Sequence, residues 1–117
     1  MSLPRLLLRL EGLALLAAAV FLYFAQDRPL WAFLLFLLAP DLAAAGYAFG
    51  PRIGSVVYNL AHITVWPILL GLLGWRLGWS WATAAALIWL AHIGMDRLFG
   101  YGLKYPDGFK QTHLDKV

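Results

Sequence analysis

The sequence predicts an all-α polytopic membrane protein: an up-down-up-down bundle of four transmembrane helices with a short structured C-terminal tail. Of its 117 residues, 62% are hydrophobic and 13% are charged, whereas about a quarter of the residues in a soluble domain are charged. Four apolar runs each approach the length of about 20 residues that a helix needs to cross a bilayer. The connections between them are too short for a soluble domain and favour antiparallel neighbours.

Polar or turn-forming residues separate the four apolar runs. Asp27, Arg28 and Pro29 end the first run, Gly50-Pro51-Arg52 forms a turn after the second, and Arg76-Leu-Gly78 follows the third. The predicted helices cover about residues 5–24, 30–49, 53–75 and 79–99, within a transmembrane bundle that spans residues 1–100.

Two prolines fall inside the predicted second and third helices. Pro40 and Pro67 each lack the backbone N–H that an α-helix needs, and each frees the carbonyl one turn earlier. Kinks are therefore expected at both positions.

The last segment, residues 101–117, differs in composition from the helices. It is polar and rich in turn residues, yet it carries Tyr101, Tyr105 and Phe109. Burying one aromatic side chain contributes roughly 1.5 to 3 kcal/mol. We therefore expect this tail to fold back over the bundle, with Asp107 and His113 more often solvated than part of a site.

The basic residues predict the orientation in the membrane. All Lys and Arg residues except Arg28 and Arg76 fall on the side that holds both termini. Since Lys and Arg are retained in the cytoplasm during insertion, both termini are expected to be cytoplasmic. The basic residues flank apolar runs and form no basic face, which argues against nucleic-acid binding. The lack of cysteine excludes disulfides and thiolate chemistry.

An ionisable or polar residue interrupts each apolar run at a similar depth. Counted at about 1.5 Å per residue from the cytoplasmic ends, these residues fall about 10 to 15 Å below that surface. Ionisable groups in a bilayer are costly unless they face protein, water or a ligand. Facing helices of a bundle can combine such groups into a metal site, and the predicted metal ligands are Glu11, Asp41, His62 and His92.

Helical spacing extends this predicted site. Asn59 and His62 are three residues apart, and His92 and Asp96 are four apart, so each pair shares a helix face. Ser55 lies one turn before Asn59 on the same face. We therefore expect three further residues to hydrogen bond to the ligands or to act as additional ligands: Ser55, Asn59 and Asp96.

The chemistry of these side chains favours a divalent cation. Carboxylate oxygens and imidazole nitrogens without sulfur suit zinc, iron or manganese. A bound metal ion acidifies a water molecule, and one of Glu11, Asp41 or Asp96, where not used as a ligand, could act as the catalytic general base. This predicts a metal-dependent hydrolase acting on a lipid or another amphiphile.

Other functions fit the same residues. The polar side chains could form a hydrogen-bonded network that only fixes the helix register. His62 and His92 could ligate a haem, which would leave Glu11 and Asp41 unexplained. The chain could also be an accessory or structural subunit of a larger membrane complex. Glu11, near Arg5 and Arg9, could instead extend to the membrane interface.

Several motifs carry a resemblance to a known family. They are Arg9-Leu-Glu-Gly-Leu13, Ala39-Pro-Asp-Leu42, Gly50-Pro-Arg52, Tyr58-Asn-Leu-Ala-His62, Trp89-Leu-Ala-His-Ile-Gly-Met-Asp-Arg97, Gly100-Tyr-Gly-Leu-Lys-Tyr-Pro-Asp-Gly-Phe109 and Thr112-His113. Together they resemble the bacterial membrane-protein family called domain of unknown function 4260, over nearly the whole chain. The resemblance implies a multi-pass protein of the bacterial inner membrane and no particular reaction.

Overall fold

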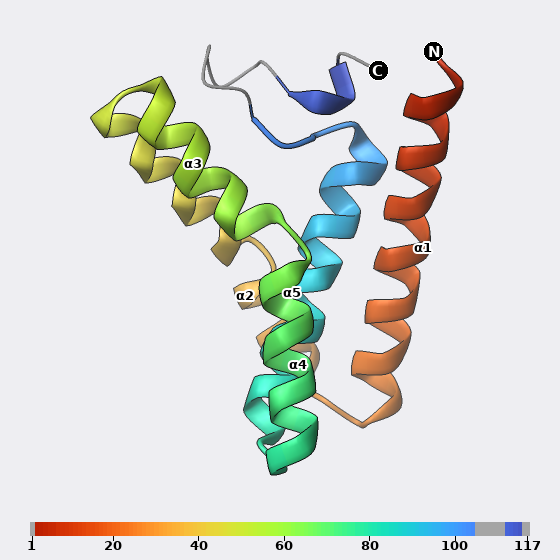
Figure 1. Ribbon diagram of the computed structural model, residues 1–117. Coiled ribbons are helices and arrows are strands. Elements are labelled where there is room, and N and C mark those ends of the chain that lie inside the picture. Colours follow the sequence, from red (N-terminus) through yellow and green to blue (C-terminus); the bar gives the residue numbers. More distant parts are fainter. Residues whose placement is uncertain (1, 105–111, 116–117) are drawn as a thin grey trace.

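The computed structural model describes residues 2–104 and 112–115 (Figure 1). Its described residues form helices and no strand, which confirms the predicted all-helical class. The α-helices are α1 (Leu3–Ala25), α2 (Leu30–Phe36), α3 (Pro51–His62), α4 (Val65–Leu77) and α5 (Ser80–Phe99), and the 3-10 helices are η1 (Ala39–Phe49) and η2 (His113–Asp115).

The second and third apolar runs are each broken into two helices. The breaks fall at residues 37–38, between α2 and η1, and at residues 63–64, between α3 and α4. Pro40 and Pro67 lie in the first turn of the element that follows each break. A proline is tolerated there because the first-turn N–H groups have no intrahelical acceptor. The chain direction therefore changes just before each proline.

Helix α5 occupies the centre of the molecule. It packs against α1 along one side and against α4 on another, while η1 packs against α3. Figure 1 shows α1 and α5 side by side, with α3 leaning away from them. The start of α1 and the short helix η2 lie at the same end of the molecule as the turn that joins η1 to α3. The packing is thus more open than a closed four-helix bundle.

Glycines allow the closest approaches between helices. A Cβ atom on Gly94 of α5 would lie 2.6 Å from the Leu16 amide nitrogen and 2.7 Å from the Gly12 carbonyl oxygen of α1. Gly46 and Gly54 serve the η1–α3 pair in the same way, since a Cβ atom on either would collide with Val57 or Tyr47. These small residues let backbones meet directly, as is common between membrane helices.

The surface of the molecule is strongly apolar. Large side chains such as Phe21 and Trp75 are more than 70% exposed, and the small core centres on Tyr23, Phe33 and Ile88. Three segments, Leu3–Ala25, Leu30–Phe49 and Pro51–Leu77, are long and apolar enough to cross a membrane. Helix α5, which carries two acidic or basic residues and a histidine near its C-terminal end, is not among them. The apolar exterior is typical of a membrane protein, because lipid replaces water as its surroundings.

Candidate metal site

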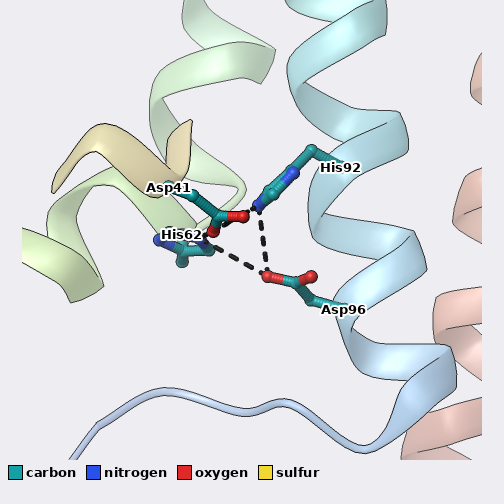
Figure 2. Close-up of side chains that lie close together, drawn as sticks. All are labelled: Asp41, His62, His92 and Asp96. Atoms are coloured by element: carbon teal, nitrogen blue, oxygen red, sulfur yellow. Dashed lines mark hydrogen bonds and ion pairs between the residues drawn. The ribbon is translucent and has the colours of Figure 1, made fainter. Parts of the chain in front are cut away.

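Four ionisable side chains meet between η1, α3 and α5 (Figure 2). Asp41 comes from η1, His62 is the last residue of α3, and His92 and Asp96 lie one turn apart on α5. One ligand atom from each residue lies within 4.8 Å of all the others. Three of the four predicted ligands, Asp41, His62 and His92, are therefore brought together, and Asp96 joins them.

Five of the six distances between these atoms are short and nearly equal, and the sixth, between the two aspartate oxygens, is within 4.8 Å. The two histidine Nε2 atoms are 3.1 Å apart. Asp41 Oδ1 lies 3.3 Å from Nε2 of His62 and 3.1 Å from Nε2 of His92. Asp96 Oδ2 lies 3.4 Å and 3.2 Å from the same two nitrogens. Figure 2 shows the four side chains pointing toward a common centre.

This arrangement fits a tetrahedral metal centre. With metal–ligand bonds of about 2.0 to 2.1 Å, the ligand atoms of a regular tetrahedron are about 3.3 to 3.4 Å apart. The five distances above span 3.1 to 3.4 Å. The five distances that involve a histidine nitrogen therefore match the edges of a zinc tetrahedron.

Burial differs between the members of this group. His62 and His92 are almost completely buried, and Asp96 is 8% exposed. The Asp41 side chain, in contrast, is 47% exposed. The site is thus closed on the side of α5 and accessible on the side of η1.

Hydrogen bonding on its outer side orients His62. The Nδ1–H group donates to the Tyr58 carbonyl oxygen at 2.7 Å, and the Tyr58 ring stacks on the imidazole at 3.8 Å between centroids. This bond places the ring proton on Nδ1, so that Nε2 presents its lone pair to the site, as in metal-ligating histidines. His92 Nδ1 is buried without a hydrogen-bond partner among the described residues.

The break after α3 also positions His62. Because the helix stops there, its last carbonyls lack intrahelical partners. Trp89 Nε1 donates to the Ala61 carbonyl at 2.6 Å, and Arg97 Nη2 donates to the His62 carbonyl at 3.2 Å. Both donors come from α5, the helix that carries His92 and Asp96. One helix thus fixes three of the four candidate ligands.

The other residues predicted for this site have different surroundings. Glu11 is exposed on α1 and lines a small pocket with Thr64 and Arg97, apart from the four-residue group. Asn59 points to the C-terminal segment, where its amide receives the Lys104 N–H at 2.6 Å and donates to the Lys104 carbonyl at 2.7 Å. Ser55 is buried and donates to the Arg52 carbonyl.

The C-terminal segment packs on the helices through residues that the sequence did not single out. Leu114 is completely buried, and Arg5 Nε donates to its carbonyl at 2.7 Å. The Lys104 ammonium lies 4.9 Å from the centre of the Tyr58 ring, which itself stacks on His62. Tyr101 is exposed, and Tyr105, Asp107 and Phe109 lie outside the described residues. Burial of a single leucine in a polar segment leaves no periodic hydrophobic pattern that sequence reasoning could detect.

Comparison with known proteins identifies the family. The family model described as "Domain of unknown function (DUF4260)" matches residues 5–117. The chain belongs to this family. The predicted family is thereby confirmed. No curated protein and no solved structure matches this DUF4260 chain.

His113 links the C-terminal segment of this DUF4260 protein to α5. The Leu103 N–H donates to His113 Nδ1 at 2.8 Å, and the Arg97 guanidinium lies 3.0 Å from Nε2. Burial, and next the positive charge of Arg97, lower the pKa of His113 from its ordinary value. Protonation would place a proton on the acceptor nitrogen and a second cation beside Arg97. The neutral ring is therefore the form that holds the segment in place.

We expect docking of the C-terminal segment to weaken as the pH falls below about 6.5, the ordinary pKa of histidine. Because the folded pKa is lower, the docked state binds fewer protons, so its stability is complete above that pH and decreases below it. Hydrogen exchange at residues 103–104 and 112–115, corrected for intrinsic pH dependence, measures this. In His113→Gln most of this pH dependence should disappear. Because the variant keeps His62 and His92, any pH dependence caused by those two residues would remain. Equal pH dependence in both proteins would contradict the assignment.

Proposed function

We propose that this protein is a membrane-embedded metalloprotein that binds one divalent cation, best matched by zinc, through Asp41, His62, His92 and Asp96. The observation that carries the proposal is the set of five contacts of 3.1 to 3.4 Å between nitrogen and oxygen atoms around one point. Neighbouring carboxylates and imidazoles at these distances match the edges of a tetrahedral coordination sphere.

A cation explains this geometry better than a purely structural hydrogen-bonded network. With its Nδ1 proton donated to Tyr58, neutral His62 offers only a lone pair at Nε2. The carboxylate oxygens that face it at 3.3 and 3.4 Å are also acceptors. Neutral His92 can supply one proton at most to the group. Acceptors would therefore face acceptors in a mostly buried site, unless a cation or additional protons lie between them.

The donor set supports zinc over a softer metal. Two imidazole nitrogens and two carboxylate oxygens form a site without sulfur. The nearly equal spacing favours four-coordinate geometry, whereas magnesium and calcium require six or more oxygen ligands. Manganese and iron(II) remain consistent with the same atoms at lower affinity.

The unequal burial of the ligands suggests hydrolytic chemistry. Catalytic zinc sites use three protein ligands and leave one position open, whereas four protein ligands close the site. Asp41 is the exposed ligand and is carried by η1, a separate element from the α5 and α3 residues. Bound metal would acidify a water molecule in the open position. Asp41, released from the ion, lies where it could accept that proton, with His62, His92 and Asp96 as the fixed ligands.

The site geometry does not favour haem ligation. Bis-histidine ligation places the two imidazoles on opposite faces of a porphyrin. Here the two Nε2 atoms are 3.1 Å apart, and both aspartates contact the same two atoms. A macrocycle between the rings would displace all four side chains.

The apolar exterior limits the substrate class. Two segments suited to crossing a bilayer, Leu30–Phe49 and Pro51–Leu77, contribute Asp41 and His62 to the site, so compounds dissolved in the membrane have direct access. We therefore propose an ester or amide of an amphiphile as the substrate. The proposed setting is the bacterial inner membrane with both termini in the cytoplasm, on the evidence of the basic residues at that end.

We expect protein purified in mild detergent without chelator, then loaded with zinc and desalted, to retain one equivalent per chain by elemental analysis. His62→Ala and His92→Ala should each retain less than 0.2 equivalents, because each removes one of the three fixed ligands and leaves only two. Glu11→Gln is the matched control and should keep the full equivalent, since Glu11 lies outside the group. Zinc should also raise the melting temperature of wild type and Glu11→Gln, but not that of the two histidine variants. Loss of zinc in Glu11→Gln, or its retention in His92→Ala, would contradict the site.

We expect the zinc-loaded protein in lipid micelles to hydrolyse a p-nitrophenyl ester of a medium-chain fatty acid. Asp41→Asn should lower kcat at least 100-fold, as loss of a general base typically does, while most of the bound zinc is retained. Asp96→Asn should lose zinc and activity together. The assay follows nitrophenolate release, with chelator-treated protein as the blank. Activity that survives chelation, or no activity above the blank with zinc bound, would reject the hydrolase function.

A further inference from the structure

An apolar cavity extends from near the metal site toward the connection between α1 and α2. Its volume is about 660 Å³, within the range of small-molecule sites, and it lies between the start of α2, the start of η1 and the first half of α5. Small side chains leave the space: Ala32, Ala39, Pro40, Ala84 and Ala85.

The cavity is long and apolar. Trp81 and Trp89 mark two positions along its α5 wall, which are eight residues or about 12 Å apart along the helix axis. Tyr23 contributes its ring, and its hydroxyl already donates to the Pro29 carbonyl at 2.7 Å. The shape and lining therefore suit an extended hydrocarbon chain. Water is not favoured there, because it needs two or more polar partners.

Arg28 is the only charged residue among the described residues that line this cavity. Its Nε and Nη2 groups donate to the Gln26 side chain, and its Nη1 donates to the Ser80 carbonyl at 2.9 Å. All these acceptors are uncharged. Among the described residues no carboxylate forms an ion pair with Arg28, so its positive charge is held in position and not neutralised.

The surroundings of Arg28 match the edge of a bilayer. It lies in the connection between α1 and α2, at the start of the apolar segment Leu30–Phe49. Trp79 and Trp81 stack near the start of α5, which Arg28 contacts through Ser80. Tryptophan and arginine at the end of a membrane segment are typical of the headgroup region, where arginine can bind a phosphate.

We propose that this cavity binds one acyl chain of an anionic phospholipid, whose headgroup phosphate pairs with Arg28. Charge complementarity selects the headgroup, and the apolar walls hold the chain. The cavity lining includes Pro40, which directly precedes Asp41, and Trp89, which lies three residues before His92. The bound lipid would thus cover the approach to the metal site from the membrane. The lipid site and the metal site use different residues, so either can be present without the other.

Native mass spectrometry tests the lipid site directly. The protein is equilibrated in micelles with equal amounts of phosphatidylglycerol and phosphatidylcholine of identical chains, and retained lipids are counted. Wild type should retain one phosphatidylglycerol per chain, with at least tenfold preference over phosphatidylcholine. Arg28→Gln should reduce this preference at least fivefold. Arg76→Gln is the matched control, because Arg76 is exposed and does not line the cavity.

A second variant tests the acyl-chain cavity itself. Ala85 is exposed and lines the cavity, so Ala85→Trp fills it with little effect on the core. This variant should retain zinc but lose both lipids. Equal effects of Arg28→Gln and Arg76→Gln, or full lipid retention in Ala85→Trp, would overturn the proposal. Displacement of phosphatidylglycerol by equimolar palmitate would also overturn the proposal, because it indicates that the cavity binds a free fatty acid. A protein dimer that forms as lipid is removed would overturn it too, because it indicates that a second copy of the protein occupies the cavity.

Discussion

Four nitrogen and oxygen atoms of histidine and aspartate side chains meet in a largely buried space, and the rest of the structure depends on this constraint. Carboxylate oxygens and imidazole lone pairs at 3.1 to 3.4 Å repel one another unless a cation or additional protons lie among them. In surroundings of low dielectric constant this repulsion is strong. The cost is offset only if the surrounding helices hold the side chains in a geometry that a cation can complete.

Several unusual features of the chain serve that geometry. The break before Pro67 ends α3 at His62, so that this side chain leaves the helix end and turns toward α5. Trp89 and Arg97 then satisfy the carbonyls that the break exposes. The earlier break before Pro40 starts η1 and brings Asp41 to the same centre. Helix breaks at membrane depth are tolerated where the freed backbone groups lie inside the protein.

Much of the fold was accessible from sequence because apolar length and turn residues determine membrane helices. The limits of the first and last helices, Leu3–Ala25 and Ser80–Phe99, lie within two residues of those predicted. The two broken helices could be located by their prolines, but the extent of the gap depends on tertiary hydrogen bonds. Likewise, the close packing of α1 on α5 depends on glycine contacts, such as that of Gly12 and Gly94, which have no composition signal.

The candidate site was partly predictable for the same reason. Depth along each helix placed Asp41, His62 and His92 in one layer, and the i, i+4 spacing placed Asp96 on the face of His92. Depth alone does not give the direction of a side chain around its helix. Glu11 shares the layer but lies in a different pocket, and Asn59 shares a face with His62 but binds the C-terminal segment. Helix packing sets the direction of each side chain around its helix axis, and this direction places Glu11 and Asn59 away from the four ligand atoms.

X-ray absorption at the zinc edge of the metal-loaded protein tests the central claim most directly. We predict four nitrogen or oxygen neighbours at about 2.0 Å, with the outer-shell scattering of two imidazole rings. The zinc that remains in His92→Ala should show the scattering of one imidazole ring instead of two. A six-coordinate sphere at longer distances, or a spectrum without imidazole scattering, would contradict the account.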